Sequence, residues 1–337
     1  MIFVTGASGL VGSHLLYELV NKKQRIRALY RNDASIAWVE KIFSLYGANS
    51  KQLCEQIEWV KGDVLDNDSL EHGMEGVSEV YHCAAVVSFS PRDHSKMMQV
   101  NIEGTANVVN AALLNNVKKL CHVSSVAALG RSSKASWIDE SSDWVNSGQN
   151  SKYAISKHLA EREVWRGFAE GLKGVIVNPS IIIGQGDPAK SSARLLAQVH
   201  KGNRFYTNGI NAFVDVQDVV GAMILLMESN VENERFVVSG ANCSYKQLFD
   251  LIADGFGKPR PSIEAKRWML GLLWRFEYLR NFLTGSKPLI TKETSKTSLG
   301  KHYYSSRKLV DSFNFRFTPI EDSIQRNCKL YERLISL

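Results

Sequence analysis

The chain has 337 residues, of which 44% are hydrophobic and 22% are charged, as in a globular protein with a hydrophobic core. Its net charge of +7 is spread along the chain without a dense basic run, which argues against nucleic-acid binding and favours anionic small molecules as partners. The five cysteines are widely spaced and no cluster has metal-ligand spacing, so we expect neither a disulfide framework nor a metal site.

Strand-like and helix-like segments alternate in the first part of the chain. Short apolar runs predict strands at Ile2–Thr5, Ile26–Tyr30, Ile57–Val60, Glu79–Cys83, Lys119–Ser124 and Gly174–Pro179. Helical spacing predicts helices at Leu10–Asn21, Asp66–Met74, Glu103–Asn115 and Tyr153–Gly167. This order predicts an α/β protein with a Rossmann-type, doubly wound parallel sheet.

The alternation weakens after Gly184. The sequence still predicts strands at Phe213–Val216 and Arg235–Ser239, and helices at Ser192–His200, Asp218–Glu228, Tyr245–Gly255 and Thr318–Leu337. We expect residues 1–184 to form a dinucleotide-binding domain, completed by segments near 212–240. Residues 185–337 are then mainly a small C-terminal cap that binds substrate, interleaved with the first domain.

One segment of this tail, Lys266–Leu283, is unusually rich in Trp, Leu and Phe. It fits an amphipathic helix on a membrane, a cap helix over a pocket, or ordinary core packing, and we favour the cap. No run of about 18 apolar residues predicts a spanning helix. Since a strand begins at residue 2, we expect no signal peptide and a cytoplasmic protein.

A glycine-rich turn joins the first strand to the first helix. Gly6, Gly9 and Gly12 recur at every third position there. Glycine permits a positive φ and a close backbone approach, and a helix start offers free N–H groups and partial positive charge to a pyrophosphate. In this context the turn predicts a dinucleotide site, and the alternative is a turn with only a packing role.

The end of the second strand bears on the choice of nicotinamide cofactor. An acidic residue there would hold the ribose 2′-hydroxyl, but the chain has Tyr30-Arg31-Asn32. The guanidinium of Arg31 could bind a 2′-phosphate, so we favour NADP(H), and Asp33 leaves NAD(H) open. After the third strand, Asp63 could accept a hydrogen bond from the adenine amino group or cap a helix.

Three polar residues form the candidate catalytic group. Tyr153 and Lys157 lie four residues apart, on one face of a predicted helix. A nearby cation lowers the pKa of a phenol, which is otherwise about 10, so Tyr153 could donate a proton to a carbonyl oxygen as hydride arrives, or remove it in reverse. Ser125 follows the fifth strand and could bind that oxygen, whereas Ser124 is assigned a structural role.

Together these motifs resemble the extended short-chain dehydrogenase/reductases of the NAD-dependent epimerase/dehydratase superfamily. The resemblance rests on six further segments: Thr5-Gly6-Ala7-Ser8-Gly9-Leu10-Val11-Gly12, Gly62-Asp63-Val64-Leu65-Asp66, Tyr81-His82-Cys83-Ala84-Ala85, Asn101 to Asn107, Asn178-Pro179-Ser180 with Ile182, and Val214 to Val220. It implies that Asn101 supports the active site. It also implies cofactor contacts from Gly6, Ser8, Gly9, Leu10, Val11, Gly12, Arg31, Asp63, Val64, Ala84, Ala85, Val123, Tyr153, Lys157, Pro179 and Ile182.

Within this superfamily the chain is most similar to the dihydroflavonol-reductase-like and 3β-hydroxysteroid-dehydrogenase-like branch. Nucleotide-sugar epimerases usually carry an acidic residue where this chain has Tyr30, and an arginine before the late strand, where Asn211-Ala212-Phe213 stands. We therefore predict an NADP(H)-dependent oxidoreductase that exchanges hydride with a carbonyl or alcohol carbon of a small organic substrate. A nucleotide-sugar epimerase or dehydratase with tightly bound NAD, and a non-catalytic dinucleotide sensor, are the alternatives.

The resemblance also implies a homodimer, formed through the helices near Asn101–Leu114 and Tyr153–Gly167. Trp165 and Phe168 lie at the end of the second helix. Either they anchor this interface or they belong to the core.

Overall fold

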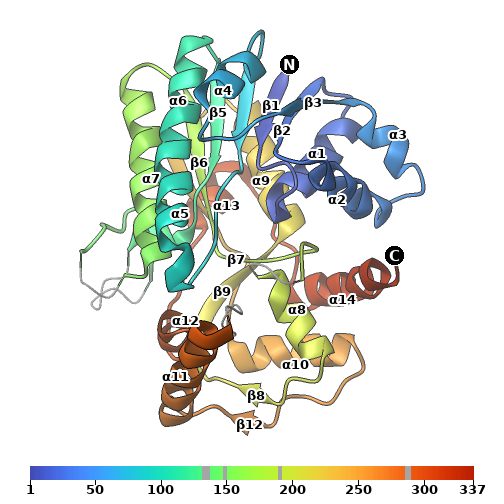
Figure 1. The fold of residues 1–337 in the computed structure, drawn as a ribbon, viewed down its shortest axis with the longest axis vertical. Coiled ribbons are helices and arrows are strands. Elements are labelled where there is room, and N and C mark those ends of the chain that lie inside the picture. Colours follow the sequence, from blue (N-terminus) through green and yellow to red (C-terminus); the bar gives the residue numbers. More distant parts are fainter. Residues whose placement is uncertain (131–136, 147–149, 189–191, 285–289) are drawn as a thin grey trace.

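The computed structural model describes residues 1–130, 137–146, 150–188, 192–284 and 290–337, and its centre is a seven-stranded parallel sheet (Figure 1). The strands follow the order β10-β6-β5-β4-β1-β2-β3, so the chain order reverses at β1. Their bounds are β1 (Ile2–Thr5), β2 (Ile26–Tyr30), β3 (Ile57–Lys61), β4 (Glu79–His82), β5 (Lys119–Val123), β6 (Gly174–Pro179) and β10 (Glu234–Val238). The predicted doubly wound fold is confirmed.

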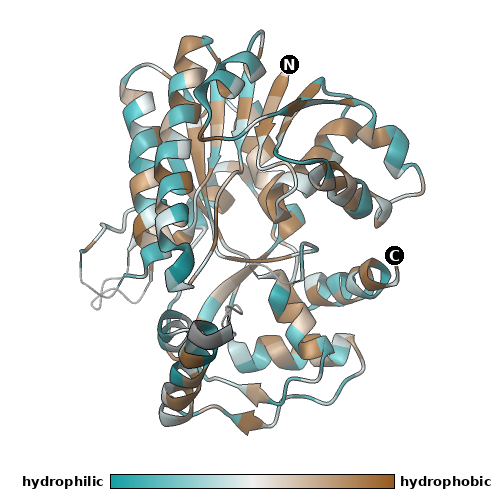
Figure 2. Ribbon diagram, viewed as in Figure 1, coloured by the Kyte–Doolittle hydropathy of each residue, from teal (hydrophilic) through white to brown (hydrophobic). Residues whose placement is uncertain are grey.

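Helices cover both faces of this sheet. One face carries α1 (Leu10–Asn21), α2 (Asp33–Ser44), α3 (Ser50–Cys54), α9 (Val216–Glu228) and α13 (Arg307–Phe313). The other carries α4 (Asn67–Gly73), α5 (His94–Met98), the π-helical turn η2 (Gln99–Glu103), α6 (Gly104–Leu114) and α7 (Lys152–Ala169). Figure 2 shows hydrophobic strands between helices whose outer faces are largely hydrophilic.

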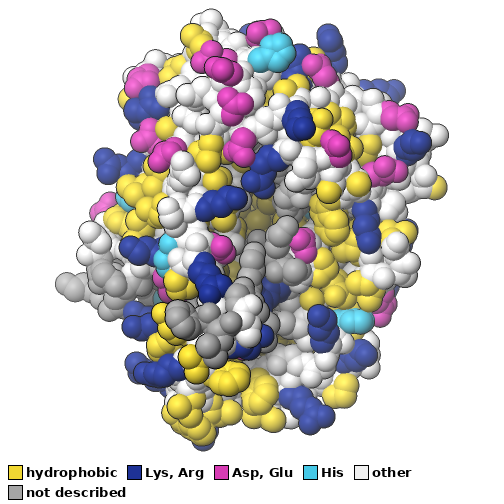
Figure 3. Space-filling view, in the orientation of Figure 1, with side chains coloured by type: hydrophobic (Ala, Val, Ile, Leu, Met, Phe, Trp, Pro, Cys, Tyr) yellow, Lys and Arg dark blue, Asp and Glu magenta, His cyan; other side chains and the backbone are white. Residues whose placement is uncertain are grey.

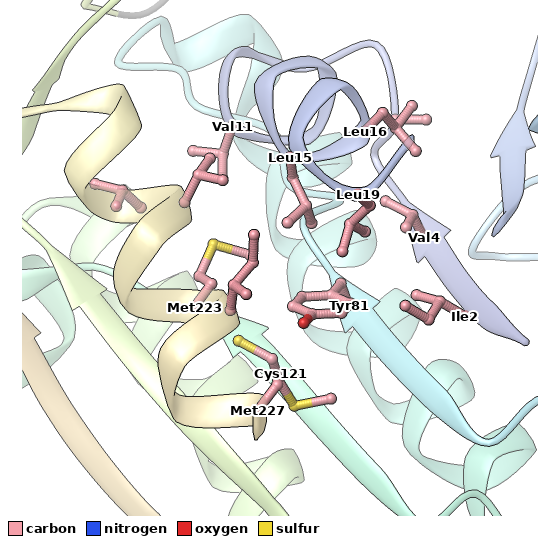
Figure 4. Close-up of a cluster of buried hydrophobic side chains, with 14 of the residues drawn as sticks. Ile2, Val4, Val11, Leu15, Leu16, Leu19, Tyr81, Cys121, Met223 and Met227 are labelled. Atoms are coloured by element: carbon pink, nitrogen blue, oxygen red, sulfur yellow. The ribbon is translucent and has the colours of Figure 1, made fainter. Parts of the chain in front are cut away.

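The core between α1, α9 and the sheet is dry and apolar. Met223 and Met227 of α9 point toward Tyr81 and Cys121 of the sheet (Figure 4). All four side chains are 5% exposed or less. Burying such side chains contributes roughly 1.5–3 kcal/mol each, which makes the sheet a rigid base for groups at its edges.

The C-terminal part forms a second, smaller layer below the main sheet (Figure 1). It has a three-stranded sheet, β11 (Ala241–Ser244)-β9 (Ile210–Asp215)-β7 (Ile181–Ile183), and a two-stranded one, β12 (Ile263–Glu264)-β8 (Phe205–Tyr206). Its helices are α8 (Ala193–His200), α10 (Tyr245–Gly255), α11 (Arg267–Thr284), α12 (Lys292–Thr297) and α14 (Ile320–Ser336). Among the described residues, no helix is both long and apolar enough to cross a membrane.

The region near 212–240 divides between these two layers. Its strand β10 pairs with β6 and extends the main sheet, and α9 packs on that sheet. Strand β9 instead pairs with β7 and β11, so it belongs to the smaller layer. The predicted strand through Val216 ends one residue earlier, because Asp215 caps α9 by accepting a hydrogen bond from the backbone N–H of Gln217 at 2.8 Å.

Candidate active site

The turn after β1 requires glycine at two of its three predicted positions. Gly6 has a φ of 69°, and a Cβ there would lie 2.5 Å from the Ala84 nitrogen. A Cβ at Gly12 would lie 2.2 Å from the Gly6 oxygen. Gly9 caps α1 without a side-chain hydrogen bond, and no acidic residue occupies the first helical turn. This backbone cradle, at the N-terminus of α1, fits a dinucleotide pyrophosphate.

The other predicted cofactor residues follow the carboxyl ends of the parallel strands. Ser8, Leu10 and Val11 follow β1, Asp63 and Val64 follow β3, Ala84 and Ala85 follow β4, Val123 ends β5, Pro179 ends β6, and Ile182 lies in β7. The ends of β1, β3, β4, β5 and β6 meet at one edge of the main sheet, where ligands of such folds bind, whereas β7 belongs to the three-stranded sheet. The side chains of Val11 and Val64 are core residues, so only their backbone is available to a ligand.

Arg31 and Asp63 differ in how they are held. Arg31 is exposed one residue beyond β2 and forms no hydrogen bond or ion pair with the residues that the structure describes. Asp63 accepts a hydrogen bond from the Leu65 nitrogen at 3.1 Å. It therefore shapes the turn after β3 and does not cap α4, whose N-terminal cap is Asp66.

The structure brings the three candidate catalytic residues together. Tyr153 lies in the first turn of α7, which Ser151 caps by accepting a hydrogen bond from the Ala154 nitrogen. The hydroxyl of Ser125, just beyond β5, lies within reach of the Tyr153 phenol, and it accepts a hydrogen bond from the Ala127 nitrogen at 3.2 Å. One turn along α7, Lys157 is 2% exposed, and its Nζ donates to the carbonyl oxygen of Val123 at 2.8 Å.

Burial controls the proton affinities of this group. It raises the pKa of Tyr153, and the hydrogen bond with Ser125 opposes the rise. It lowers the pKa of Lys157 to about 8, and the carboxylate of Glu161 opposes that change. The sequence predicts a lowered pKa for Tyr153, and this prediction is wrong for the described residues, because desolvation outweighs the favourable contacts and the Lys157 ammonium donates to Val123.

Asn101 supports the start of the catalytic helix. Its Nδ2 donates to Ser156 Oγ at 2.9 Å, and Ser156 Oγ donates to the Tyr153 carbonyl at 2.8 Å. Both amide atoms also bond the backbone of Val86, at 2.7 and 3.0 Å. Asn101 lies in the π-helical turn η2, a distortion often found at functional sites. These contacts connect its side chain through Ser156 to the backbone of Tyr153.

A buried chain of hydrogen bonds connects the glycine turn to Asn101. Thr5 Oγ1 bonds His82 Nδ1 at 2.7 Å, and His82 Nε2 bonds Thr105 Oγ1 at 3.0 Å. Thr105 in turn donates to the Asn101 carbonyl at 2.6 Å. Burial, with the Lys157 charge, lowers the pKa of His82 to about 3. The imidazole is therefore a neutral structural link.

Glu161 is a member of the site that the sequence does not reveal. It is 3% exposed, one turn beyond Lys157 on α7. Its Oε2 accepts hydrogen bonds from Ser124 Oγ and Asn178 Nδ2, both at 2.8 Å, and its Oε1 pairs with Arg235 at 3.1 Å. The structural role predicted for Ser124 follows from this contact. The only signal in the sequence is the four-residue spacing from Lys157.

Two contacts connect the site to the rest of the molecule. The ring of Phe89 lies edge-on to Tyr153, with centroids 5.8 Å apart, and forms an apolar wall beside the phenol. In the smaller layer, Glu293 of α12 accepts a hydrogen bond from the Lys152 nitrogen at 3.3 Å. The C-terminal layer therefore reaches the first residue of the catalytic helix.

The two aromatic residues at the end of α7 face inward. Phe168 is 7% exposed and packs in the core between the sheet and α6, so the interface alternative is wrong for its side chain. Trp165 is half-buried against the same core and donates to Glu161 Oε1 at 3.4 Å. The described residues contain no group of three or more metal-binding side chains.

Comparison with known proteins defines the class of the protein. The model of the NAD dependent epimerase/dehydratase family matches residues 2–239, and the chain belongs to this family. It is an NAD(P)-dependent enzyme of the extended short-chain dehydrogenase/reductase type.

Several relatives and solved structures resemble the chain over most of its length. Sterol demethylase protein B from Methylococcus capsulatus is 28% identical over 264 residues, 77% of this chain and 76% of that protein. A putative dihydroflavonol 4-reductase from Synechocystis is 27% identical over 330 residues, 96% and 92% of the two chains. The crystal structure of gox2253 superposes with a TM-score of 0.79 at 28% identity, over 99% and 98% of the two chains. The structure of a UDP-glucose 4-epimerase from Thermotoga maritima superposes with a TM-score of 0.77 at 19% identity, over 99% of each chain, which shows that the two proteins share a fold.

Proposed function

We propose that the protein is an NADP(H)-dependent oxidoreductase that transfers hydride to or from a carbonyl or alcohol carbon of a small organic substrate. One observation carries this proposal: the Tyr153 phenol, the Ser125 hydroxyl and the Lys157 ammonium gather at the sheet edge that also holds the glycine turn. We assign dinucleotide binding to residues 1–184 with α9 and β10, and substrate binding mainly to residues 185–337.

The mechanism assigns a separate task to each side chain. The bound nicotinamide supplies or accepts the hydride. Since burial raises its pKa, Tyr153 is protonated at neutral pH and ready to give its proton to a carbonyl oxygen. Ser125, whose hydroxyl lies within reach of the phenol, orients the same oxygen. With a pKa of about 8, Lys157 is mostly protonated at pH 7, and its charge favours the phenolate that the proton transfer leaves.

Preference for NADP(H) is assigned to Arg31. Its guanidinium is exposed and unpaired among the described residues, and the acidic residue that favours NAD is replaced by Tyr30. A fluorescence titration of the full chain with NADPH and NADH tests this assignment. Arg31→Ala should weaken NADPH binding and leave NADH binding unchanged, whereas the exposed Arg25→Ala, at the other end of β2, should change neither. Equal loss for both nucleotides would refute the role of Arg31.

Apolar carbonyl compounds are the favoured substrates. Phe89 forms an apolar wall beside Tyr153, and related proteins carry the names of dihydroflavonol 4-reductase and cinnamoyl-CoA reductase. Aromatic and alicyclic ketones and aldehydes should be reduced with NADPH that carries deuterium at its transferable position. Mass spectrometry should find the deuterium on the alcohol carbon. Oxidation of NADPH without label in any alcohol would refute hydride transfer to substrate.

The epimerase alternative has less structural support. Nucleotide-sugar epimerases usually carry an arginine before the late strand that binds the diphosphate of the sugar nucleotide, and Asn211 stands near that position in this chain. Asn211 is 4% exposed, and its amide donates to the Tyr245 hydroxyl at 3.3 Å. Denaturing the purified protein and identifying the released nucleotide distinguishes the epimerase from the oxidoreductase. Stoichiometric NAD would favour the epimerase, whereas an exchangeable nucleotide favours the oxidoreductase.

A further inference from the structure

Helix α11 exposes most of its apolar side chains and buries two of its polar ones. Five of its apolar residues recur at intervals of one to four positions and remain 42–65% exposed: Trp268, Leu272, Leu273, Phe276 and Leu279. On the inner side, Leu270, Glu277 and Asn281 are 4–7% exposed. A surface helix of a globular protein normally has the reverse arrangement, with its apolar stripe toward the core. The outer stripe therefore lacks a partner among the described residues.

The apolar stripe continues onto the small sheet beside it. Phe205 of β8 and Ile263 of β12 are register partners, and both are more than 40% exposed. Only two residues separate the end of β12 from the start of α11. Figure 1 places α11, β8 and β12 at the same lower end of the molecule, where Figure 3 shows hydrophobic side chains gathered. We call the five helix residues, Phe205 and Ile263 the apolar face.

Exposed basic residues flank the members of the apolar face along the chain. Arg204 precedes Phe205, whereas Lys266 and Arg267 precede Trp268, and all three basic side chains are exposed. Two more exposed basic residues, Lys258 and Arg275, lie before β12 and within α11. The acidic neighbours are few: Glu264 is exposed beside Ile263, whereas the carboxylate of Glu277 is buried and paired with Arg280 at 2.7 Å. The rim of the apolar face is therefore positively charged.

We propose that the apolar face docks on the surface of a membrane that contains anionic lipids, with α11 lying in the plane of the interface. Trp, Phe and Leu on one side of a helix, with Arg and Lys at its margins, match the two layers that such a surface offers: acyl chains and negative headgroups. A second copy of the chain is a poorer occupant, because a symmetric contact would bring like basic rims together. The sequence alone favoured a cap over membrane contact, and the outward direction of these side chains reverses that preference.

This inference does not rest on the proposed reaction, although the docked end adjoins the site. Helix α12 packs against α11, and its Glu293 bonds the backbone of Lys152, next to Tyr153. A membrane under the apolar face would thus lie close to the layer assigned to substrate binding.

Co-sedimentation of the full chain with vesicles tests the proposal. The protein should pellet with vesicles of equal parts phosphatidylcholine and phosphatidylserine, remain in solution with phosphatidylcholine alone, and be released at high salt. Arg267→Gln with Arg275→Gln should lower the partition coefficient by roughly 25-fold, about five-fold for each charge removed. Trp268→Ser with Phe276→Ser should abolish pelleting. The matched control Trp137→Ser removes a tryptophan that is 54% exposed elsewhere, and it should bind like the parent chain.

Three results would overturn the proposal. The first is failure of the parent chain to pellet with the anionic vesicles, and the second is equal pelleting of the Trp268→Ser, Phe276→Ser variant. The third is a dimer of the parent chain that this variant converts to a monomer, which would make the apolar face a contact between copies. Because both substituted side chains are exposed, thermal unfolding followed by circular dichroism should show that the variant remains folded.

Discussion

Replacement of Lys157 by Met should change how the stability of the fold depends on pH. The side chain is 2% exposed, and burial lowers its pKa from 10.5 to about 8. A pKa difference of that size between the folded and the unfolded chain destabilises the fold by about 3 kcal/mol at pH values where the amine is protonated in both. At pH values between these two pKa values, the unfolded chain binds more protons than the folded chain. The destabilisation therefore declines as the pH rises.

Urea unfolding of the parent chain and of Lys157→Met at pH 7 and pH 9.5 measures this effect. The difference in unfolding free energy between the two proteins should shift by about 2 kcal/mol in favour of the parent chain at the higher pH. The unpaired Val123 carbonyl in the variant adds a cost that does not depend on pH, and other titrating groups are common to both proteins. Parallel stability profiles would show that the ammonium is not desolvated, and would refute the electrostatics described for the site.

Two further substitutions test neighbouring parts of the site. Glu161→Gln removes the charge that raises the Lys157 pKa, so the alkaline limb of the kcat/KM profile should move to lower pH, whereas Glu163→Gln, a surface salt-bridge residue on the same helix, should leave it in place. An unmoved limb in the first variant would exclude Glu161 as a positioning residue. Gly12→Ala places a Cβ 2.2 Å from a backbone oxygen, so it should lower stability by more than about 1 kcal/mol and weaken NADPH binding in a fluorescence titration. In the control Gly271→Ala the nearest atom to the new Cβ is 3.5 Å away, so this variant should retain both its stability and its NADPH binding. Normal NADPH binding by Gly12→Ala would show that the turn does not hold the dinucleotide.

The main sheet could be predicted because its signals are local. Apolar runs of four to six residues alternate with amphipathic segments, and a glycine turn marks the first crossover, so all seven strands of the main sheet lie within a residue of their predicted bounds. In the smaller layer the helices α8, α10 and α14 follow their predicted bounds, but the short strands have no such signal. Strands β7 and β11 are only three or four residues long, and both exist because each pairs with β9. Pairing of that kind follows from the packed fold and not from local sequence.

The site likewise has residues that the sequence predicts and residues that it does not. The positions of Tyr153, Lys157 and Ser125 follow from helix and strand spacing, and the structure brings them together. The partner of Glu161 lies 74 residues away at Arg235, a distance in sequence over which spacing carries no information. The lowered pKa predicted for Tyr153 is wrong for a related reason, because desolvation depends on everything that packs around the phenol.

Single-turnover reduction by Tyr153→Phe is the most direct test of the central claim. This variant retains the aromatic ring beside Phe89 and removes only the phenol hydroxyl near Ser125. With a carbonyl substrate that the parent chain reduces, the account predicts unchanged NADPH affinity and a hydride-transfer rate lower by roughly 100-fold or more. A rate equal to that of the parent chain, at equal NADPH occupancy, would contradict the assignment of Tyr153 as the proton donor.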